Sequence, residues 1–213
     1  MVDKEIGEIK MKYKKVYVTA IIPAKTDSTR LLKKNLRIVD GKTLVEHAID
    51  YALKSEYVKD IIVSTESDEI RKICKSYNEH ILVYDRPNGL LKNAEVADVY
   101  VDMFQNQFKK NGEWRIPQMT THVVGLQPDH PDRTNSLDDM IEYFIDNTYD
   151  DLVTVDRHGT RNGSVRIVKV EYVKWGTMSK RVGSMMDDCT NIHSEEDLNQ
   201  AEENILNGRS FTK

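Results

Sequence analysis

The run from Val16 to Ile22 (VYVTAII) is almost entirely apolar and rich in β-branched residues, and it stops abruptly at Pro23. A strand with one face in water alternates apolar and polar residues, whereas a continuous apolar run is typical of a strand buried on both faces. Strands of that kind occur chiefly in parallel sheets whose two faces are covered by helices. This run therefore predicts a central strand of an α/β domain.

The same succession of strand, loop and helix recurs along the rest of the chain. Short apolar runs that stop at proline or polar residues predict strands, and apolar residues three or four apart behind Ser, Thr or acidic residues predict helices. Further strands are predicted at 60–65, 81–84, 121–127, 151–155 and 165–170, and helices are predicted to begin near residues 43, 67, 95, 136 and 194. This alternation predicts a three-layer α/β/α domain with a mostly parallel sheet, in which a ligand binds at the carboxyl ends of the strands.

The length of 213 residues suits one domain of this kind, and no repeat or flexible linker divides it. We therefore expect a single domain over residues 1–213, with residues 1–14 as a flexible N-terminal extension. No apolar run approaches the roughly 18 residues of a membrane helix, and the start of the chain lacks the apolar core of a secretory signal. Two cysteines and a net charge of −4 favour a cytoplasmic protein with no membrane and no nucleic-acid partner.

Basic residues are concentrated in the loop after the first predicted strand: Lys25, Arg30, Lys33, Lys34 and Arg37. At the carboxyl end of a strand, such a loop can offset the roughly four negative charges of a nucleoside triphosphate with backbone N–H groups and cationic side chains. A solvated basic surface loop is the alternative, and the composition of the loop by itself leaves both open. The loop contains neither G-x-x-x-x-G-K nor G-x-G-x-x-G, which disfavours P-loop NTPases and dehydrogenases.

The full loop sequence, IIPAKTDSTRLLKKNL over 21–36, resembles the signature I-P-A-R-x-x-S-x-R-x-x-x-K-N-L of the CMP-sugar-acid synthetases. These CTP-dependent cytidylyltransferases include the CMP-sialic acid synthetases and the CMP-KDO synthetases, and the resemblance extends over about 16–205. It implies a Rossmann-like nucleotidyltransferase domain that binds CTP and an acidic small-molecule acceptor. It also implies nucleotide contacts from Ala24, Lys25, Ser28 and Asn35, and catalytic charge stabilisation by Lys25, Arg30 and Lys34. Lys25 stands where arginine is usual, and lysine lacks the bidentate fork of arginine.

Two more segments follow in the order of that family. The segment 84–87 (YDRP) resembles one whose arginine packs on the nucleotide, which assigns Arg86 to nucleotide binding; a turn set by Pro87 is the alternative. The segment 126–134 (LQPDHPDRT) resembles L-Q-P-T-S-P-L-R-T of the sialic acid enzymes. It implies that Gln127 contacts both nucleotide and acceptor and that His130 contacts the acceptor. Asp129 resembles the metal-binding and catalytic aspartate of the CMP-KDO pattern Q-G-D-E-P.

The segment 161–164 (RNGS) resembles R-P-N-G-A, which implies that Arg161 pairs with the acceptor carboxylate and that Asn162 shapes its pocket. A hairpin turn at Asn162 and Gly163 is the alternative, and the two are compatible. The segment 191–198 (NIHSEEDL) resembles D-I-D-T-x-E-D-L, whose two aspartates bind the catalytic cation.

Asn191 and His193 stand at the positions of those two aspartates. Mg²⁺ prefers hard oxygen ligands, whereas Mn²⁺ tolerates nitrogen better. We therefore expect Mg²⁺, or else Mn²⁺, bound by Asp129, Asn191 and His193 with lower affinity than in the family pattern. A helix-capping or surface histidine is the alternative for His193.

The resemblance implies transfer of CMP from CTP to a sialic-acid-like or other 2-keto-3-deoxy sugar acid, with release of pyrophosphate, as in cell-surface polysaccharide biosynthesis. Transfer to a phosphonate or another small acidic metabolite and a CTP-binding pseudoenzyme remain alternatives. A glycosyltransferase of similar fold is a further one, against which the chain has no strict D-x-D. The resemblance also implies a homodimer, with the region after Asp156 reaching toward the partner.

Overall fold

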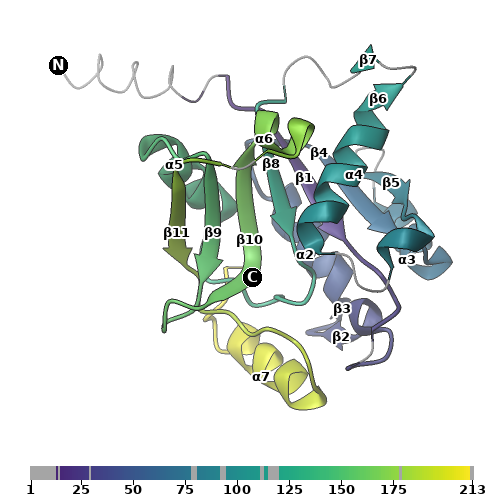
Figure 1. Ribbon diagram of the computed structural model, residues 1–213. Coiled ribbons are helices and arrows are strands. Elements are labelled where there is room, and N and C mark those ends of the chain that lie inside the picture. Colours follow the sequence, from purple (N-terminus) through teal and green to yellow (C-terminus); the bar gives the residue numbers. More distant parts are fainter. Residues whose placement is uncertain are drawn as a thin grey trace.

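The computed structural model describes residues 13, 15–28, 30–77, 81–91, 95–110, 113–114, 120–177 and 179–211. A seven-stranded sheet in the order β11-β9-β10-β8-β1-β4-β5 forms its centre (Figure 1). The strands are β1 (Val18–Pro23), β4 (Val58–Thr65), β5 (Ile81–Asp85), β8 (His122–Leu126), β9 (Asp151–Val155), β10 (Arg161–Lys169) and β11 (Val182–Met186). Neighbouring strands are parallel except β10, which runs antiparallel to both β8 and β9. The mostly parallel sheet predicted from the sequence is confirmed.

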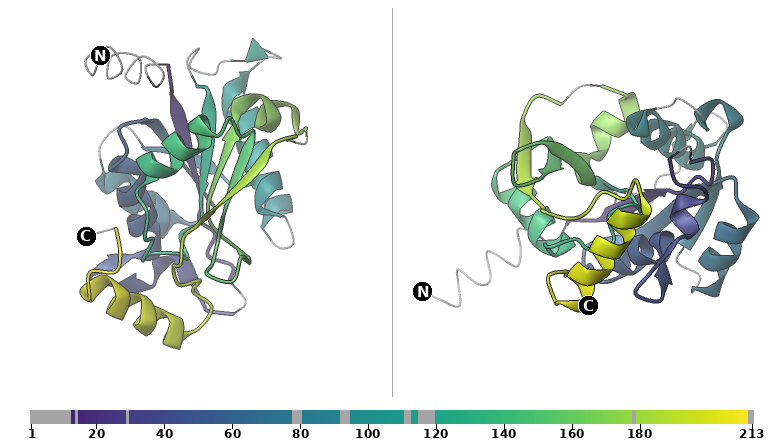
Figure 2. Two further views of the ribbon diagram at one scale, coloured as in Figure 1. Left: turned by 90° about the vertical axis from the view of Figure 1, so that its left-hand side faces the viewer. Right: turned by 90° about the horizontal axis from the view of Figure 1, so that it is seen from below.

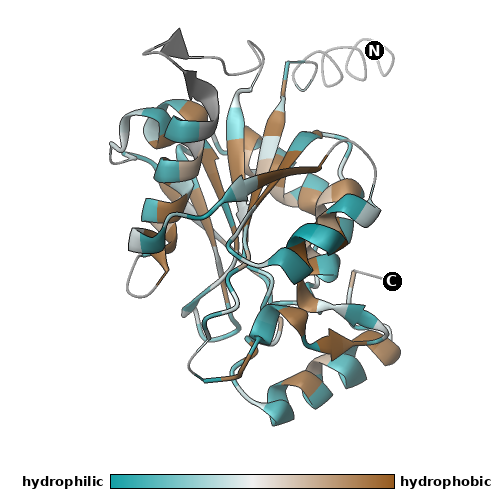
Figure 3. Ribbon diagram, turned by 90° about the vertical axis from the view of Figure 1, so that its right-hand side faces the viewer, coloured by the Kyte–Doolittle hydropathy of each residue, from teal (hydrophilic) through white to brown (hydrophobic). Residues whose placement is uncertain are grey.

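Helices cover both faces of this sheet. They are α2 (Leu44–Leu53), α3 (Asp68–Ser76), α4 (Val96–Phe108), α5 (Leu137–Asp146), α6 (Val170–Trp175) and α7 (Glu195–Leu206). Apolar residues of α2, α3 and α5 join one core cluster with Ala20 and Ile22 of β1, whereas α4 and α6 pack with Ile21 on the other face. Figure 3 shows the hydrophobic residues gathered on the central strands. The three-layer α/β/α architecture is therefore confirmed.

A third hydrophobic cluster lies at the carboxyl ends of the strands. The short ladder of β2 (Ile38–Val39) and β3 (Lys42–Thr43) and the helix α7 form a cluster of their own there, which includes the buried Leu44, Ile192 and Ile205. Figure 2 shows α7 beneath the lower edge of the sheet rather than against one of its faces. This packing brings the C-terminal part of the chain to the edge where the ligand is expected.

Helix starts follow the capping signals in the sequence. Thr43 and Glu46 form a reciprocal capping box, in which each side chain bonds to the backbone N–H of the other. The side chains of Ser67, Ser136 and Ser194 accept hydrogen bonds from the first turns of α3, α5 and α7. The predicted starts of these helices are confirmed because a cap depends only on neighbouring residues.

Several short elements were not predicted, among them β2 and β3. The edge strand β11 has a single neighbouring strand and leaves Val182 and Met186 at least half exposed, so its sequence lacks the continuous apolar run of the central strands. The short helix α6 follows β10 directly and ends at Gly176, which adopts a left-handed conformation. Beside these, β6 (Lys109–Lys110) and β7 (Glu113–Trp114) form a two-stranded ladder after α4.

The hairpin turn expected at Asn162 and Gly163 lies earlier in the chain. β9 and β10 are joined by a tight turn in which Asp156 N donates to Thr160 O at 2.8 Å. The segment after Asp156 therefore returns at once to the sheet instead of forming an arm, and a homodimer through this segment stays a prediction. Residues 1–12 and 14, expected as an extension, lie outside the described residues. Within the described ranges, no helix is long and apolar enough to cross a membrane.

Candidate functional site

A pocket of about 210 Å³ opens at the carboxyl ends of β1, β5 and β8. It is lined by Pro23, Lys25, Ser28, Lys34, Asn35, Arg86, Val96, Gln127, Pro128 and Asp129. These residues come from four separate segments of the chain, and most of them are predicted site residues. Parallel strands place their following loops at one edge of a sheet, which is why these segments meet.

The loop after β1 is held by its own neighbours. The buried Ala24 donates its N–H to Ser64 O at 2.9 Å, and Asn35 Nδ2 donates to Lys25 O at 2.7 Å. The ammonium of Lys25 donates to Leu91 O at 2.8 Å. Lys25 thus lines the pocket while its ammonium is hydrogen-bonded to Leu91, in the loop after β5. Asn35 binds the backbone carbonyl of Lys25.

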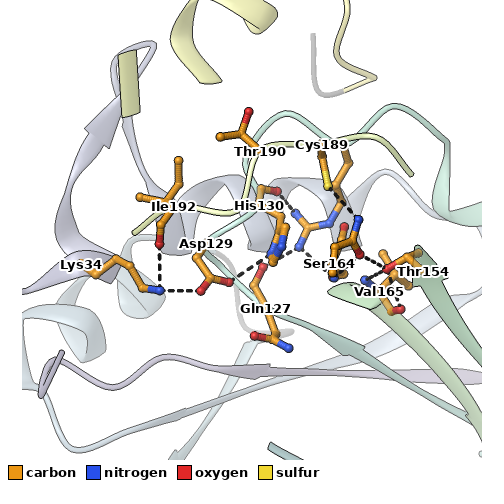
Figure 4. A network of polar contacts seen from close by, with 12 residues as sticks. Lys34, Gln127, Asp129, His130, Thr154, Ser164, Val165, Cys189, Thr190 and Ile192 are labelled. Atoms are coloured by element: carbon orange, nitrogen blue, oxygen red, sulfur yellow. Dashed lines mark hydrogen bonds and ion pairs between the residues drawn. The ribbon is translucent and has the colours of Figure 1, made fainter. Parts of the chain in front are cut away.

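Lys34 and Asp129 form an ion pair inside the pocket. Lys34 Nζ lies 2.5 Å from Asp129 Oδ2 and donates to Ile192 O at 3.1 Å (Figure 4). Burial alone would raise the pKa of Asp129, but the neighbouring His130 and Lys34 hold this pKa well below its usual value. The carboxylate is therefore ionised across the physiological pH range.

Arg86 and Arg30 occupy different environments. Arg86 is 9% exposed, lines the pocket and donates through Nε to Leu90 O at 3.1 Å. The turn anticipated after Pro87 is a short 3₁₀ helix, η2 (Asn88–Leu90), which returns this carbonyl to the arginine. Arg30 is exposed and is not among the residues that line the pocket, and its charge contributes to lowering the pKa of His193.

Arg133 is a buried residue to which the sequence assigned no role. It is fully buried and donates to three carbonyl oxygens, those of His130 at 2.6 Å, Gln127 at 2.6 Å and Ser164 at 3.1 Å. Its guanidinium carbon also lies 4.9 Å from the centre of the Tyr51 ring. Arg133 therefore fixes the loop that carries Gln127 and Asp129. The only signal of this role was its place in the segment 126–134.

His130 does not reach the lining of the pocket. Its side chain is 0% exposed, and Nδ1 lies 3.1 Å from Asp129 Oδ1 without the alignment of a hydrogen bond. In Figure 4 the ring lies beside Asp129, on the side away from Lys34. This arrangement corrects the expected placement of His130 against an acceptor, because the loop turns its ring inward.

Arg161 and Asn162 also lie outside the pocket lining. Asn162 Oδ1 accepts from Thr154 Oγ1 at 2.7 Å, and Nδ2 donates to Asp187 O at 2.7 Å, so its amide is used within the protein. Arg161 is exposed at the first position of β10. The structure therefore does not place these two side chains at the pocket, where they were expected to contact an acceptor.

Gly163 lies directly behind the pocket. A Cβ at this position would lie 2.4 Å from Gln127 Nε2, and its φ of +77° belongs to the left-handed region. The positive φ favours glycine at this position, and a larger residue would also displace the amide of Gln127. The N-G dipeptide therefore lies within β10, where the register with β9 shifts between Arg161 and Arg166, and it packs against Gln127.

The segment 191–193 lies beside Asp129, since Ile192 N donates to Asp129 O at 2.9 Å. Asp129 Oδ1 and Asn191 Oδ1 are buried oxygens without a hydrogen-bond partner. Two such oxygens suit a hard divalent cation. Among the described residues, no group of three or more His, Cys, Asp or Glu side chains is arranged to hold a metal ion.

His193 is partly buried next to these oxygens. Burial, together with the charges of Lys34 and Arg30, lowers its pKa, which favours the neutral imidazole. Its backbone N–H donates to Asp197 Oδ2 at 2.8 Å, so the main chain of His193 takes part in the cap of α7. Ser194 is the N-cap residue of α7, so the role of the His193 ring stays a prediction.

Comparison with known proteins shows to which family the chain is similar. The family model described as Cytidylyltransferase matches residues 19–174. The chain is 39% identical over 119 residues to the CMP-N,N'-diacetyllegionaminic acid synthase of Legionella pneumophila, covering 54% of this chain and 47% of that protein. It is 35% identical over 95 residues to the 3-deoxy-manno-octulosonate cytidylyltransferase of Koribacter versatilis, covering 41% and 36%. These matches thus span less than half the length of either relative.

Solved structures agree on the fold. CMP:2-keto-3-deoxy-manno-octonic acid synthetase in complex with CTP superimposes with a TM-score of 0.64 at 12% identity, covering 90% of this chain and 99% of that one. A cytidylyltransferase from Leptospira borgpetersenii gives a TM-score of 0.63 at 16% identity, covering 90% and 87%. The family model spans well over half of the residues, including the loops after β1, β5 and β8 that build the pocket. The chain therefore belongs to the cytidylyltransferase family.

Proposed function

We propose that this chain transfers CMP from CTP to a sugar acid and releases pyrophosphate. The observation that carries the proposal is the pocket itself, in which Lys25, Lys34 and Arg86 face Asp129 at the carboxyl ends of the strands. Cations and backbone N–H groups suit a polyphosphate, and a carboxylate among them suits the divalent cation that accompanies it. Membership of the cytidylyltransferase family supports CTP as the nucleotide.

In the proposed reaction, the acceptor hydroxyl gives up its proton to solvent water as its oxygen attacks the α-phosphorus of CTP. The new oxygen–phosphorus bond forms as the bond to pyrophosphate breaks on the opposite side. Negative charge accumulates on the departing oxygens, where the side chains of Lys25, Arg30 and Lys34 would stabilise it. No covalent enzyme intermediate is required by this scheme.

Mg²⁺, or else Mn²⁺, is the cofactor that we propose. Asp129 Oδ1 and Asn191 Oδ1 would hold it, since both are buried oxygens without a hydrogen-bond partner, and His193 lies beside them. A divalent cation supplies charge neutralisation on the phosphates when bound. Two or three protein ligands leave most of the coordination to phosphate oxygens and water, as is usual for Mg²⁺.

The acceptor is proposed to be a sialic-acid-like or other 2-keto-3-deoxy sugar acid. Support comes from the names of the relatives, which concern legionaminic acid, 3-deoxy-manno-octulosonate and N-acylneuraminate. In this chain Gln127 is the residue proposed to face both CTP and acceptor, because it lines the pocket next to Gly163.

The test is pyrophosphate release from CTP, with ATP, GTP and UTP as controls, in Mg²⁺ and in Mn²⁺ separately. The acceptor panel contains N-acetylneuraminic, legionaminic, pseudaminic and 3-deoxy-octulosonic acids and one small phosphonate. Release that depends on CTP and on a sugar acid supports the proposal. Release with the phosphonate alone would change the acceptor class. CTP that raises the melting temperature without any turnover would indicate a nucleotide-binding protein and overturn the proposed reaction.

A further inference from the structure

Glu66 follows β4 at the point where the loop after β1 begins. β1 and β4 are parallel neighbours with Pro23 opposite Ser64. The segments that follow these two strands therefore leave the sheet side by side at its carboxyl edge. Glu66 is partly buried there and is not among the residues that line the pocket. No part of the proposed chemistry uses it.

One oxygen of Glu66 binds the loop at two atoms. Glu66 Oε1 accepts from Thr26 N at 2.7 Å and from Thr26 Oγ1 at 2.6 Å. Burial alone would raise the pKa of Glu66, but these hydrogen bonds and the charge of Arg86 outweigh it, so the pKa lies below its usual value. The carboxylate is therefore ionised at neutral pH, which strengthens both bonds.

The other oxygen, Oε2, is buried and has no hydrogen-bond partner. A buried carboxylate oxygen left without a partner costs free energy, so the bonds to Thr26 and the nearby Arg86 must offset that cost. An acidic side chain this close to a polyphosphate pocket would repel the ligand if it faced it. Because it points at the loop backbone instead, it shapes the loop without entering the pocket.

Because of the position of Thr26, this contact affects the loop that lines the pocket. Thr26 lies between Lys25 and Ser28, which both line the pocket, and Ser28 N donates to Thr26 O at 2.8 Å. The bond from Asn35 to Lys25 O fixes the loop from one side, and Glu66 fixes it from the other. A loop that is ordered before the ligand arrives loses less conformational entropy on binding, and affinity rises accordingly.

We propose that Glu66 is a positioning residue for CTP: by holding Thr26, it keeps the loop from Ala24 to Ser28 in the shape that presents Lys25 and Ser28 to the phosphates. This inference rests on the proposed function of the pocket. The sequence analysis identified the basic residues of this loop, whereas Glu66 is an acidic residue outside the pocket lining.

The test compares Glu66→Ala, Glu66→Gln and Glu66→Asp, with Asp68→Asn as the matched control. Asp68 is an acid two residues later whose side chain is 90% exposed. Loss of two charge-assisted hydrogen bonds in Glu66→Ala is expected to raise both the CTP dissociation constant and KM for CTP about 10- to 100-fold, with a much smaller change in kcat. Glu66→Gln keeps an acceptor for Thr26 and should lose less. Asp68→Asn should match the wild type.

Thr26→Ala in the Glu66→Ala background supplies a second check. If Glu66 acts through Thr26, the double variant binds CTP about as well as Glu66→Ala alone. Fully additive losses would overturn the role of Thr26. Unchanged CTP affinity in Glu66→Ala would overturn the proposal, and so would equal falls in kcat and affinity that follow a large loss of melting temperature.

Hydrogen exchange of the ligand-free protein separates this inference from the proposed function. The Thr26 amide should exchange about tenfold faster or more in Glu66→Ala, while the Ile70 amide of α3 keeps its wild-type rate. Wild-type protein that fails to bind CTP would sink the proposed function. The Thr26 amide would still decide whether Glu66 orders the loop, and an unchanged exchange rate there would overturn the inference.

Discussion

Lys34 Nζ lies 2.5 Å from Asp129 Oδ2, so the residue expected to bind phosphate and the residue expected to bind the cation are paired with each other. Both side chains are largely buried, at 16% and 14% exposed. The pair keeps each charge compensated while no ligand is bound. In the proposed function, phosphate oxygens of CTP would offer Lys34 a second anionic partner at the same place.

Replacing Lys34 by methionine tests this pairing. Loss of a cation aimed at the leaving phosphates is expected to lower kcat for pyrophosphate release about 100-fold or more. The matched control is Lys33→Met, because Lys33 is a neighbouring lysine whose side chain is 54% exposed and pairs with Glu69 at the surface. Equal activity of the two variants in a CTP turnover assay would remove Lys34 from the reaction.

Asp129→Asn is expected to weaken the use of the cation while keeping the shape of the side chain. The concentration of Mg²⁺ that gives half-maximal turnover should rise about tenfold or more, because a neutral amide attracts a divalent cation less than a carboxylate. The measurement is a metal titration at saturating CTP. Asp139→Asn, an exposed acid in the first turn of α5, is the control. An unchanged titration in Asp129→Asn would exclude this carboxylate as a ligand.

Arg30→Ala separates function from folding. Arg30 is exposed and belongs to none of the core clusters, so its removal should change the melting temperature by less than about 2 °C. Turnover of CTP is expected to fall about 100-fold, as for loss of one charge-stabilising donor. The opposite pattern, a much lower melting temperature with turnover intact, would contradict the assignment.

Arg133→Met, in contrast to Arg30→Ala, is expected to lower the stability of the protein. It leaves three carbonyl oxygens without their donor inside the protein, and the expected cost is about 3 kcal/mol of unfolding free energy. Urea denaturation measures this loss. Arg157→Met is the control, since its exposed ion pair with Asp188 should contribute under about 1 kcal/mol. Similar denaturation midpoints for both variants would show that the loop does not depend on Arg133.

Asp197 makes the cap of α7 sensitive to acid. Burial alone would raise the pKa of Asp197, but hydrogen bonds from His193 N and from Ser194 hold it below its usual value. A lowered folded-state pKa gives stability that is complete above about pH 4 and is lost as the pH falls through the folded-state pKa.

Asp197→Ala should therefore cost about 1 kcal/mol at pH 7, the usual contribution of a cap, and clearly less at pH 3. Thermal unfolding of both proteins at the two pH values gives this difference. A cost that is the same at pH 3 and pH 7 would show that the charge of Asp197 does not contribute to the cap.

Much of the site could be predicted from sequence because its residues stand in short segments at strand ends. Lys25, Lys34 and Asn35 follow one strand, and the structure brings them to one pocket with Gln127 and Asp129. The inward turn of His130 could not be predicted, because a side chain's direction depends on what packs around the loop. Here the buried Arg133 holds the carbonyl oxygen of His130 and so sets that direction.

The sequence by itself determined the alternation of strands and helices, the helix caps and the edge of the sheet where the ligand is expected, because each depends on residues close together in the chain. Only the tertiary structure decided the pairing of Lys34 with Asp129, which are 95 residues apart, and of Thr26 with Glu66, which are 40 apart. Such pairs form when strands fix the spacing of loops that are distant in sequence. No local pattern carries that information, since each partner alone is compatible with many positions.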